Sequence, residues 1–141
     1  MPNRRILFLC IHNSCRSQMA EALMRRAAGD RLEAFSAGLE ARGVHPLAVR
    51  ALAEVGIDAS AQRSKTIQDL ADARFDYVVT TCDEAQEACP RWPGTARMLH
   101  WGFPDPSAVE GSDEERMAAF RRVRDAIAAR IRQFLEAEGN Q

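Results

Sequence analysis

The sequence lacks any apolar run that approaches the roughly 20 residues of a membrane-spanning helix, and it has almost no net charge. Its 141 residues include 19 basic and 20 acidic side chains, which give a formal net charge of −1 at pH 7. A balance so close to neutral gives no bulk attraction to nucleic acid or to an anionic membrane. The short apolar run near the start has no small-residue cleavage site after it, so we predict no signal peptide. We therefore expect a cytoplasmic protein that binds neither nucleic acid nor membrane.

Cysteine and lysine are also scarce. The chain has four cysteines, and Lys65 is the only lysine among the 19 basic residues. A domain of this length buries roughly 68–70% of its unfolded surface, so its core needs no disulfide. In the reducing cytosol such cysteines are more often catalytic or metal-binding than structural. Each of the four is therefore a candidate for chemistry.

Strands and helices are expected to alternate along the chain. Compact apolar runs predict strands, and apolar residues at helical spacing predict helices. The expected strands are 4–9, 33–36, 75–80 and 97–101, and the expected helices are 16–28, 46–55, 67–71, 83–89 and 113–137. This alternation indicates one α/β domain over residues 1–141, with a mostly parallel four-stranded sheet flanked by helices. The predicted inner face of the last helix consists of Met117, Phe120, Val123, Ile127, Ile131, Phe134 and Leu135.

Three reactive side chains follow the ends of expected strands. Cys10 ends the first strand, Cys82 follows the third, and Asp105 follows the fourth. Ligands of such sheets bind beyond the carboxyl ends of the strands. We therefore expect Cys10, Cys82 and Asp105 on the same rim of the sheet.

The segment between the first strand and the first helix has the features of an anion-binding loop. Successive backbone N–H groups at a strand–loop–helix junction can converge on an anion, and Arg16 adds a planar fork suited to tetrahedral oxyanions. The helix N-terminus and Arg16 should lower the pKa of the Cys10 thiol. Asn13 tolerates a left-handed backbone, and Ser17 can donate a hydrogen bond to the sulfur. The alternative is a buried cysteine followed by a surface arginine. The predicted oxyanion-binding residues are Cys10, Ile11, His12, Asn13, Ser14, Cys15, Arg16 and Ser17.

The motif CxHNSCRS after an apolar strand resembles the phosphate-binding loop of low-molecular-weight protein tyrosine phosphatases and of the arsenate reductases that share their fold. The resemblance extends through SAG at 36–38, VVTTC at 78–82 and HWGFPDP at 100–106, so it covers most of the chain. Glycine is common in the family at the position of His12. The two branches of the family, phosphatases and arsenate reductases, catalyse different reactions. Cys82 and Cys89 are the residues that help to distinguish them in this sequence.

Cys82 and Cys89 are separated by six residues. On an intact helix this spacing spans about 10.5 Å, whereas a disulfide needs Cα atoms within roughly 7 Å. The spacing therefore disfavours a permanent structural disulfide between Cys82 and Cys89. It suits a redox switch in which disulfide formation unwinds the segment. Zinc binding is an alternative, although no tight ligand spacing with nearby histidines supports it. Two inert buried cysteines are the other alternative.

The same spacing is found in thioredoxin-coupled arsenate reductases, and the resemblance implies their mechanism. Cys10 attacks arsenate while Arg16 and the loop amides hold its oxygens. Cys82 then attacks the adduct, which releases arsenite and leaves a Cys10–Cys82 disulfide. Cys89 attacks Cys82, and reduced thioredoxin, the electron donor, reduces the Cys82–Cys89 disulfide. Each exchange is a thiolate attack on sulfur. The resemblance gives Cys15 no obligatory part in this relay.

Asp105 lies in the rigid segment Phe-Pro-Asp-Pro. Expelling hydroxide from arsenate needs a proton donor, and a partly desolvated carboxyl can provide one. The resemblance assigns this general-acid role to Asp105. The alternative is a solvent-exposed Asp-Pro turn.

Some relatives bind potassium near the loop through residues that match Asn13, Glu21 and Ser36, with an aspartate at position 65. This chain keeps the first three and places its only lysine at position 65. We predict that the Lys65 ammonium takes the cation position, pairs with Glu21 and steadies Asn13. The alternative is a solvated loop lysine.

Three functions remain open at this stage. The first is a thioredoxin-coupled arsenate reductase, favoured by the three relay cysteines. The second is a phosphatase of the same family, and the third is a non-enzymatic oxyanion or thiol sensor. We expect arsenate and thioredoxin as partners, no bound cofactor or metal, and a monomer. His45 and His100 have no evident partner in the sequence and are assigned to the scaffold.

Overall fold

The computed structural model describes residues 4–70, 72–82 and 96–139. Within these residues, four strands form one sheet in the order β2-β1-β3-β4. The strands are β1 (Arg4–Cys10), β2 (Leu32–Gly38), β3 (Tyr77–Thr80) and β4 (Arg97–His100). Each neighbouring pair is parallel. The predicted α/β fold with a four-stranded parallel sheet is therefore confirmed.

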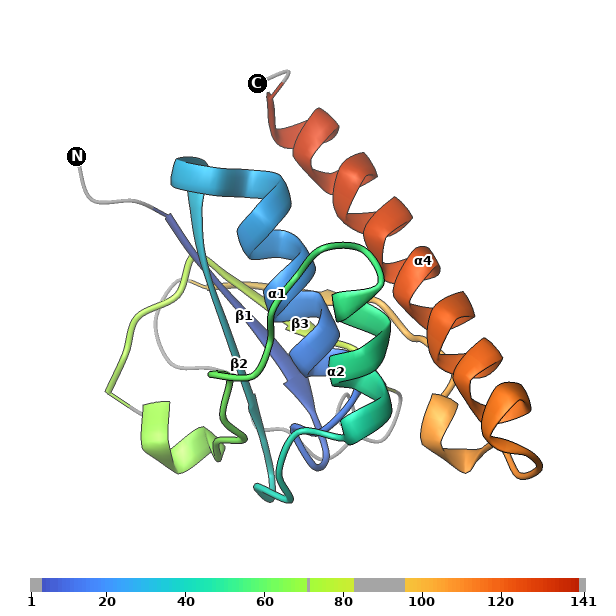
Figure 1. Ribbon diagram of the computed structural model, residues 1–141. Helices are drawn as coiled ribbons and strands as arrows, with labels where there is room; N and C mark the ends of the chain where they lie inside the picture. The colour runs from blue at the N-terminus through green and yellow to red at the C-terminus, as the bar shows by residue number, and fades with distance from the viewer. Residues whose placement is uncertain (1–3, 71, 83–95, 140–141) are drawn as a thin grey trace.

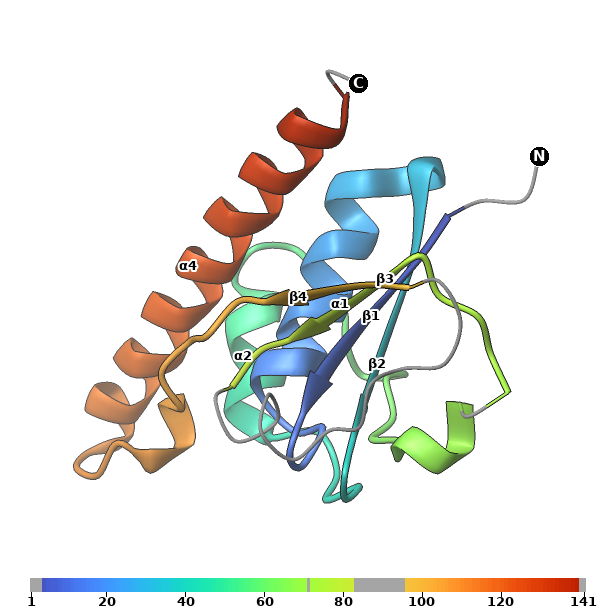
Figure 2. The ribbon, with the colours of Figure 1, turned by 180° about the vertical axis from the view of Figure 1, so that it is seen from behind.

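Among the described residues, the helices α1 (Arg16–Ala28), α2 (Pro46–Ala53) and α4 (Asp113–Gly139) cover one face of this sheet, as the two opposite views in Figures 1 and 2 show. Short 3-10 turns follow at η1 (Gly29–Arg31), η2 (Ile67–Leu70) and η3 (Pro106–Ala108). The expected helices at 16–28, 46–55 and 113–137 agree with α1, α2 and α4 to within two residues at each end. The helix expected at 83–89 lies outside the described residues.

The alternation of side chains along β1 divides the core into two layers. Ile6 and Phe8 point toward the helices and join their apolar residues. Leu7 and Leu9 point to the other face and pack with Phe75. All seven residues predicted for the inner face of α4 are buried, so helical periodicity identified that face correctly. None of the helices in the described part of the chain is both long and apolar enough to cross a membrane.

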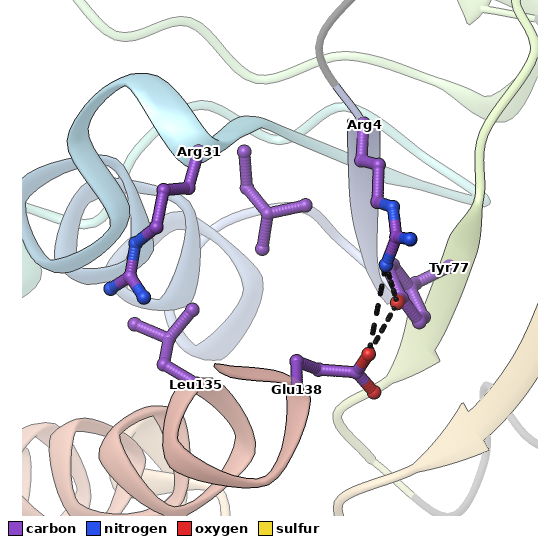
Figure 3. Close-up of a pocket in the computed structure, with 6 residues that line it drawn as sticks. Arg4, Arg31, Tyr77, Leu135 and Glu138 are labelled. Carbon is purple, nitrogen blue, oxygen red and sulfur yellow. Dashed lines mark hydrogen bonds and ion pairs between the residues drawn. The ribbon is translucent and has the colours of Figure 1, made fainter. Parts of the chain in front are cut away.

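A pocket of about 240 Å³ lies at the amino ends of the strands, where α4 finishes. Arg4 Nη1 donates to the Tyr77 hydroxyl at 3.0 Å, and that hydroxyl donates to Glu138 Oε2 at 2.8 Å. Arg97 Nη1 also lies 3.4 Å from Glu138 Oε1. Figure 3 shows the Arg4–Tyr77–Glu138 network on one side of this pocket. These contacts attach the last turn of α4 to the amino ends of β1, β3 and β4. This end of the sheet is opposite the predicted site.

Candidate active site

The loop between β1 and α1 is held in one conformation by buried polar contacts. Asn13 is fully buried and has a positive φ of 47°, the left-handed backbone expected from the sequence. Its Oδ1 accepts hydrogen bonds from Gln18 Nε2 at 2.8 Å and from the backbone N–H of Lys65 at 2.7 Å. Its Nδ2 donates to Ser17 Oγ at 2.9 Å. The cost of the left-handed backbone is therefore offset by hydrogen bonds made before any ligand arrives.

The end of β2 passes directly beneath this loop. A Cβ atom added at Gly38 would lie 2.7 Å from the backbone nitrogen of Asn13 and 2.8 Å from the carbonyl oxygens of Cys10 and Ile11. No side chain fits at those distances. Glycine at 38 is therefore required by the close approach of two backbones.

The segment after β2 binds the outward carbonyl groups of the same loop. The backbone N–H of Glu40 donates to Ile11 O at 2.9 Å, and that of His45 donates to Ser14 O at 3.1 Å. The N–H groups of Ile11 and His12 are directed instead to the Cys10 sulfur. The carbonyl groups of the loop thus point outward and its N–H groups point inward. This concave arrangement of N–H groups favours the binding of an anion.

Cys10 is the ionisable centre of this arrangement. Its pKa falls from an ordinary value of 9.0 to about 6, chiefly because the Cys82 side chain hydrogen-bonds to its sulfur. Burial opposes this shift, while Arg16 and the amides of His12 and Ile11 assist it. Most of Cys10 is therefore thiolate at neutral pH, which is the nucleophilic form. The hydrogen bond from Ser17 that the sequence suggested stays a prediction.

Cys82 lies against Cys10, as expected from the shared rim. Thr81 N donates to Leu9 O at 2.8 Å, which extends the pairing of β1 with β3 and brings the next residue beside Cys10. Cys10 and Cys82 form a small buried cluster with Ile11 packed against it. Cys10, Cys15 and Cys82, the described cysteines, are all reduced. Cys89 lies outside the described residues.

Arg16 supplies the positive charge and is nearly buried. Its Nη1 donates to Phe103 O at 3.0 Å, and its Nη2 lies 3.9 Å from Asp105 Oδ2. Its Nε is buried and has no hydrogen-bond partner among the described residues. A buried donor without a partner costs roughly 1–3 kcal/mol, so this N–H is available for an oxyanion.

Asp105 stands opposite Arg16 on the pocket wall, at the start of η3. Its Oδ1 accepts hydrogen bonds from the backbone N–H of Ser107 at 2.9 Å and from Ser107 Oγ at 2.6 Å. These two bonds fix the carboxyl group and leave Oδ2 on the side of Arg16. The sequence identified Asp105 but not Ser107, although a serine two residues after an aspartate is a recognisable local hydrogen-bonding pattern.

The second cysteine of the loop has the opposite character. Cys15 is buried, and burial is the main cause that raises its pKa to about 11. It is therefore a neutral thiol at physiological pH. This fits the expectation that Cys15 is no obligatory nucleophile.

Cys10, Cys15, Arg16 and Asp105 line a pocket of about 280 Å³ at the carboxyl ends of the strands, whereas Cys82 lies behind Cys10 and outside the lining. Three predicted loop residues, Ile11, Asn13 and Ser17, are not in its lining and support the loop from behind. Sequence reasoning missed Arg42 and His45, because nothing in the pattern shows that residues 39–45 fold against the loop. The lining residues are Cys10, His12, Ser14, Cys15, Arg16, Arg42, His45, Asp105 and Ser107.

The four residues of the predicted cation network meet behind the loop. Ser36 Oγ donates to Glu21 Oε1 at 2.9 Å, and Lys65 Nζ lies 3.5 Å from the same oxygen. Lys65 Nζ also donates to Arg63 O at 2.8 Å. Glu21 is buried, and a buried carboxylate needs a nearby positive charge. Two side chains supply positive charge: Lys65, and Arg25, whose Nη2 lies 3.4 Å from Glu21 Oε2.

The fold and the pocket define an α/β protein whose loop after the first strand places inward-facing amides, Arg16 and a Cys10 thiol of lowered pKa at one pocket. Residues 5–141 match the family described as low molecular weight phosphotyrosine protein phosphatase. The chain is 50% identical to an arsenate reductase of Halalkalibacterium halodurans over 136 residues, which cover 96% of this chain and 98% of that one. It is 47% identical to an arsenate reductase of Bacillus subtilis over 136 residues, with the same coverage. The chain belongs to the low molecular weight phosphotyrosine protein phosphatase family.

Solved structures agree with this assignment. A thioredoxin-dependent arsenate reductase of Corynebacterium glutamicum superposes with a TM-score of 0.75 at 32% identity, and the match covers 99% of this chain. This chain spans only 64% of the length of that structure. An arsenate reductase in the oxidized state gives a TM-score of 0.81 at 29% identity over 95% of this chain and 98% of that one. A tyrosine phosphatase of Erwinia amylovora, at 19% identity and a TM-score of 0.79 over 96% of this chain and 93% of that one, shows the shared fold.

Proposed function

We propose that this chain reduces arsenate to arsenite, with Cys10 as nucleophile and with electrons passed through Cys82 and Cys89 to thioredoxin. The observation that carries the proposal is the hydrogen bond between the buried Cys82 thiol and the Cys10 sulfur. A phosphatase needs a single thiolate at this loop. A reductase needs a second thiol within reach of the first.

Binding of the oxyanion follows from the lining of the pocket. A tetrahedral arsenate is proposed to take its hydrogen bonds from the loop amides and from Arg16, whose buried Nε has no partner among the described residues. The remaining nitrogens of Arg16 are held by Phe103 O and Asp105. The guanidinium is therefore oriented before the anion arrives, which reduces the ordering cost of binding.

The first chemical step forms a sulfur–arsenic bond. The Cys10 thiolate attacks arsenic(V), and an arsenate oxygen leaves as water after a proton is transferred to it. Asp105 is the proposed proton donor, because its fixed carboxyl lines the same pocket as Cys10 and Arg16. General-acid assistance of this kind contributes about 10²–10⁴-fold to such a step.

The second step carries the electrons. The Cys82 thiol transfers its proton to an oxygen of the arsenic group and attacks the Cys10 sulfur as a thiolate. The sulfur–arsenic bond breaks, and its electron pair stays on arsenic. Arsenic(V) is thereby reduced to arsenic(III), arsenite leaves, and Cys10 and Cys82 are oxidised to a disulfide. Cys89 then attacks Cys82, frees Cys10, and forms a Cys82–Cys89 disulfide that two electrons from thioredoxin reduce.

The decisive experiment is arsenate-dependent NADPH oxidation by the purified protein with thioredoxin and thioredoxin reductase. We expect sustained turnover in the parent and none in Cys89→Ser. The matched control is phosphate binding by Cys89→Ser, which should remain because the loop is untouched. Turnover that survives in Cys89→Ser would remove that cysteine from the relay.

A phosphatase is the second candidate, since the fold and Asp105 would also serve a phosphate ester. Aryl phosphate hydrolysis separates the two. Good hydrolysis without arsenate turnover would replace the proposed function, while weak hydrolysis beside arsenate turnover would reflect only the similar shape of the two anions.

A further inference from the structure

We propose that His45 is a further oxyanion-binding residue, whose Nε2–H donates a hydrogen bond to an oxygen of the anion held by the loop. The inference rests on the proposed function of the loop as an oxyanion site. Nothing in the sequence pattern marked this residue, and its assignment to the scaffold is thereby revised.

The first observation is the place of His45 in the pocket wall. It lines the same pocket as Cys10, Arg16 and Asp105. Its backbone N–H donates to Ser14 O at 3.1 Å, so the residue is tied to the anion-binding loop itself. The ring therefore keeps a fixed distance from the loop amides.

The second observation fixes the position of the proton on the ring. Nδ1 of His45 accepts a hydrogen bond at 3.1 Å from the backbone N–H of Leu47, which caps the N-terminus of α2. A backbone N–H can only donate, so Nδ1 must present a lone pair. A neutral imidazole with an unprotonated Nδ1 carries its proton on Nε2.

The third observation is that the ring is neither free to turn nor readily charged. It packs against Phe120 of α4, with ring centroids 4.8 Å apart and planes inclined at 39°. Burial and the positive charge of Arg116 lower the pKa of His45, and Asp105 opposes this only in part. The cap and the packing thus hold a neutral donor whose Nε2–H lies at the end of the ring away from α2.

Substitution by asparagine separates the two roles of the His45 side chain, which are to cap α2 and to donate a hydrogen bond in the pocket. Asparagine is among the best N-cap residues, so His45→Asn should keep the cap of α2. It should lose the proposed contact with the anion, because its amide nitrogen does not reach as far as Nε2 of the imidazole. His45→Ala removes both. His100→Asn is the matched control, because it removes an imidazole that is not in the pocket lining.

The measurement is the dissociation constant of inorganic phosphate by titration calorimetry, together with the thermal midpoint of each variant. We expect His45→Asn to keep the parent midpoint and to weaken phosphate binding about tenfold, as for loss of one hydrogen bond to a charged group. His45→Ala should show the same loss of affinity and a lower midpoint. His100→Asn should bind phosphate as the parent does.

Unchanged phosphate affinity in a folded His45→Asn would overturn the inference. If Arg16→Lys still abolishes binding in that case, the oxyanion loop stands and only the role of His45 fails. If the parent itself does not bind phosphate, the proposed site and this inference fall together.

Nitrogen-15 NMR of the imidazole rings tests the parent protein directly, even if a variant does not fold. We expect the signals of a neutral ring protonated on Nε2 and a change in the Nε2 signal when phosphate is added. A ring protonated on Nδ1, or an Nε2 signal that ignores phosphate, would contradict the proposal.

Discussion

The two ends of the sheet each carry an arginine-lined pocket, of about 280 Å³ at the carboxyl ends and about 240 Å³ at the amino ends. They differ in how their polar groups are used. At the amino ends, Arg4 and Tyr77 are bonded to Glu138. At the carboxyl ends, the loop amides face inward and Arg16 Nε has no partner among the described residues. The two pockets are similar in volume, so the feature that distinguishes the proposed site is a buried donor, Arg16 Nε, without a partner among the described residues.

The most direct test of this difference is to replace arginine by lysine in each of the two pockets. Arg16→Lys should lower kcat/KM for arsenate by about 10²–10³-fold, since one fixed donor to a developing charge contributes about that much. Arg4→Lys should leave kcat/KM within about twofold, because the described polar contacts of Arg4, to Tyr77 and Glu138, lie at the opposite end of the sheet. Steady-state kinetics of the two variants decides. Equal losses would mean that the distal pocket also takes part in the reaction.

Gly38→Ala tests whether the loop depends on the backbone beneath it. The added Cβ would meet three backbone atoms at 2.7–2.8 Å, so we expect a loss of at least about 1–3 kcal/mol in unfolding free energy and a large loss of phosphate affinity. Gly29→Ala is the control: its φ is +57° but nothing lies within 4 Å of the added Cβ. It should cost about 1–2 kcal/mol and leave affinity unchanged. Denaturant melts and phosphate titrations give both quantities.

The pH dependence of Cys10 alkylation is a third test, because it reports the pKa of the thiol in the proposed site. The rate of carboxymethylation at Cys10 should rise with pH around a midpoint of about 6, as the thiolate forms. Cys82→Ala removes the largest cause of the lowered pKa, so its midpoint should move to higher pH. Cys10 and Cys15 lie on one tryptic peptide, residues 6–16, so fragmentation of that peptide by tandem mass spectrometry is used to assign the modified sulfur. An unchanged midpoint in Cys82→Ala would show that the thiol of Cys82 does not stabilise the Cys10 thiolate.

Glu138→Ala should act on stability alone. It removes the acceptor of the Tyr77 hydroxyl and the carboxylate beside Arg4 and Arg97. We expect a loss of about 1–2 kcal/mol in unfolding free energy and no change in kcat/KM. If Glu138→Ala lowered kcat/KM but left the unfolding free energy unchanged, the amino end of the sheet would have a catalytic role and not a structural one.

Replacement of potassium by sodium should have the smallest effect of all. We propose that the Lys65 ammonium stands where a cation would neutralise Glu21, because Nζ lies 3.5 Å from Glu21 Oε1. Activity at constant ionic strength should then be the same in either salt. Lys65→Asp should become sensitive to potassium. Strong potassium activation of the parent would contradict the proposal.

The sequence was sufficient for the four strands and for α1, α2 and α4, but not for their lateral contacts; the helix expected at 67–71 is the shorter 3-10 turn η2 (Ile67–Leu70). Apolar periodicity and Gly29 located α1, and the motif located the loop, because both signals are local. The sequence placed Cys10 and Cys82 on the same rim of the sheet, but their direct contact depends on the pairing of β1 with β3, which residue spacing does not encode. His45 was missed for the same reason, since its role depends on how the segment 39–45 folds back on the loop.

The contact of Cys10 with Cys82 also bears on damage by oxidants. A thiolate with a pKa of about 6 is the thiol that peroxide attacks first. Further oxidation of the resulting sulfenic acid would be irreversible, but a neighbouring thiol converts it to a disulfide, which a dithiol can reduce. The neighbour that makes Cys10 reactive is thus also placed to protect it from permanent inactivation.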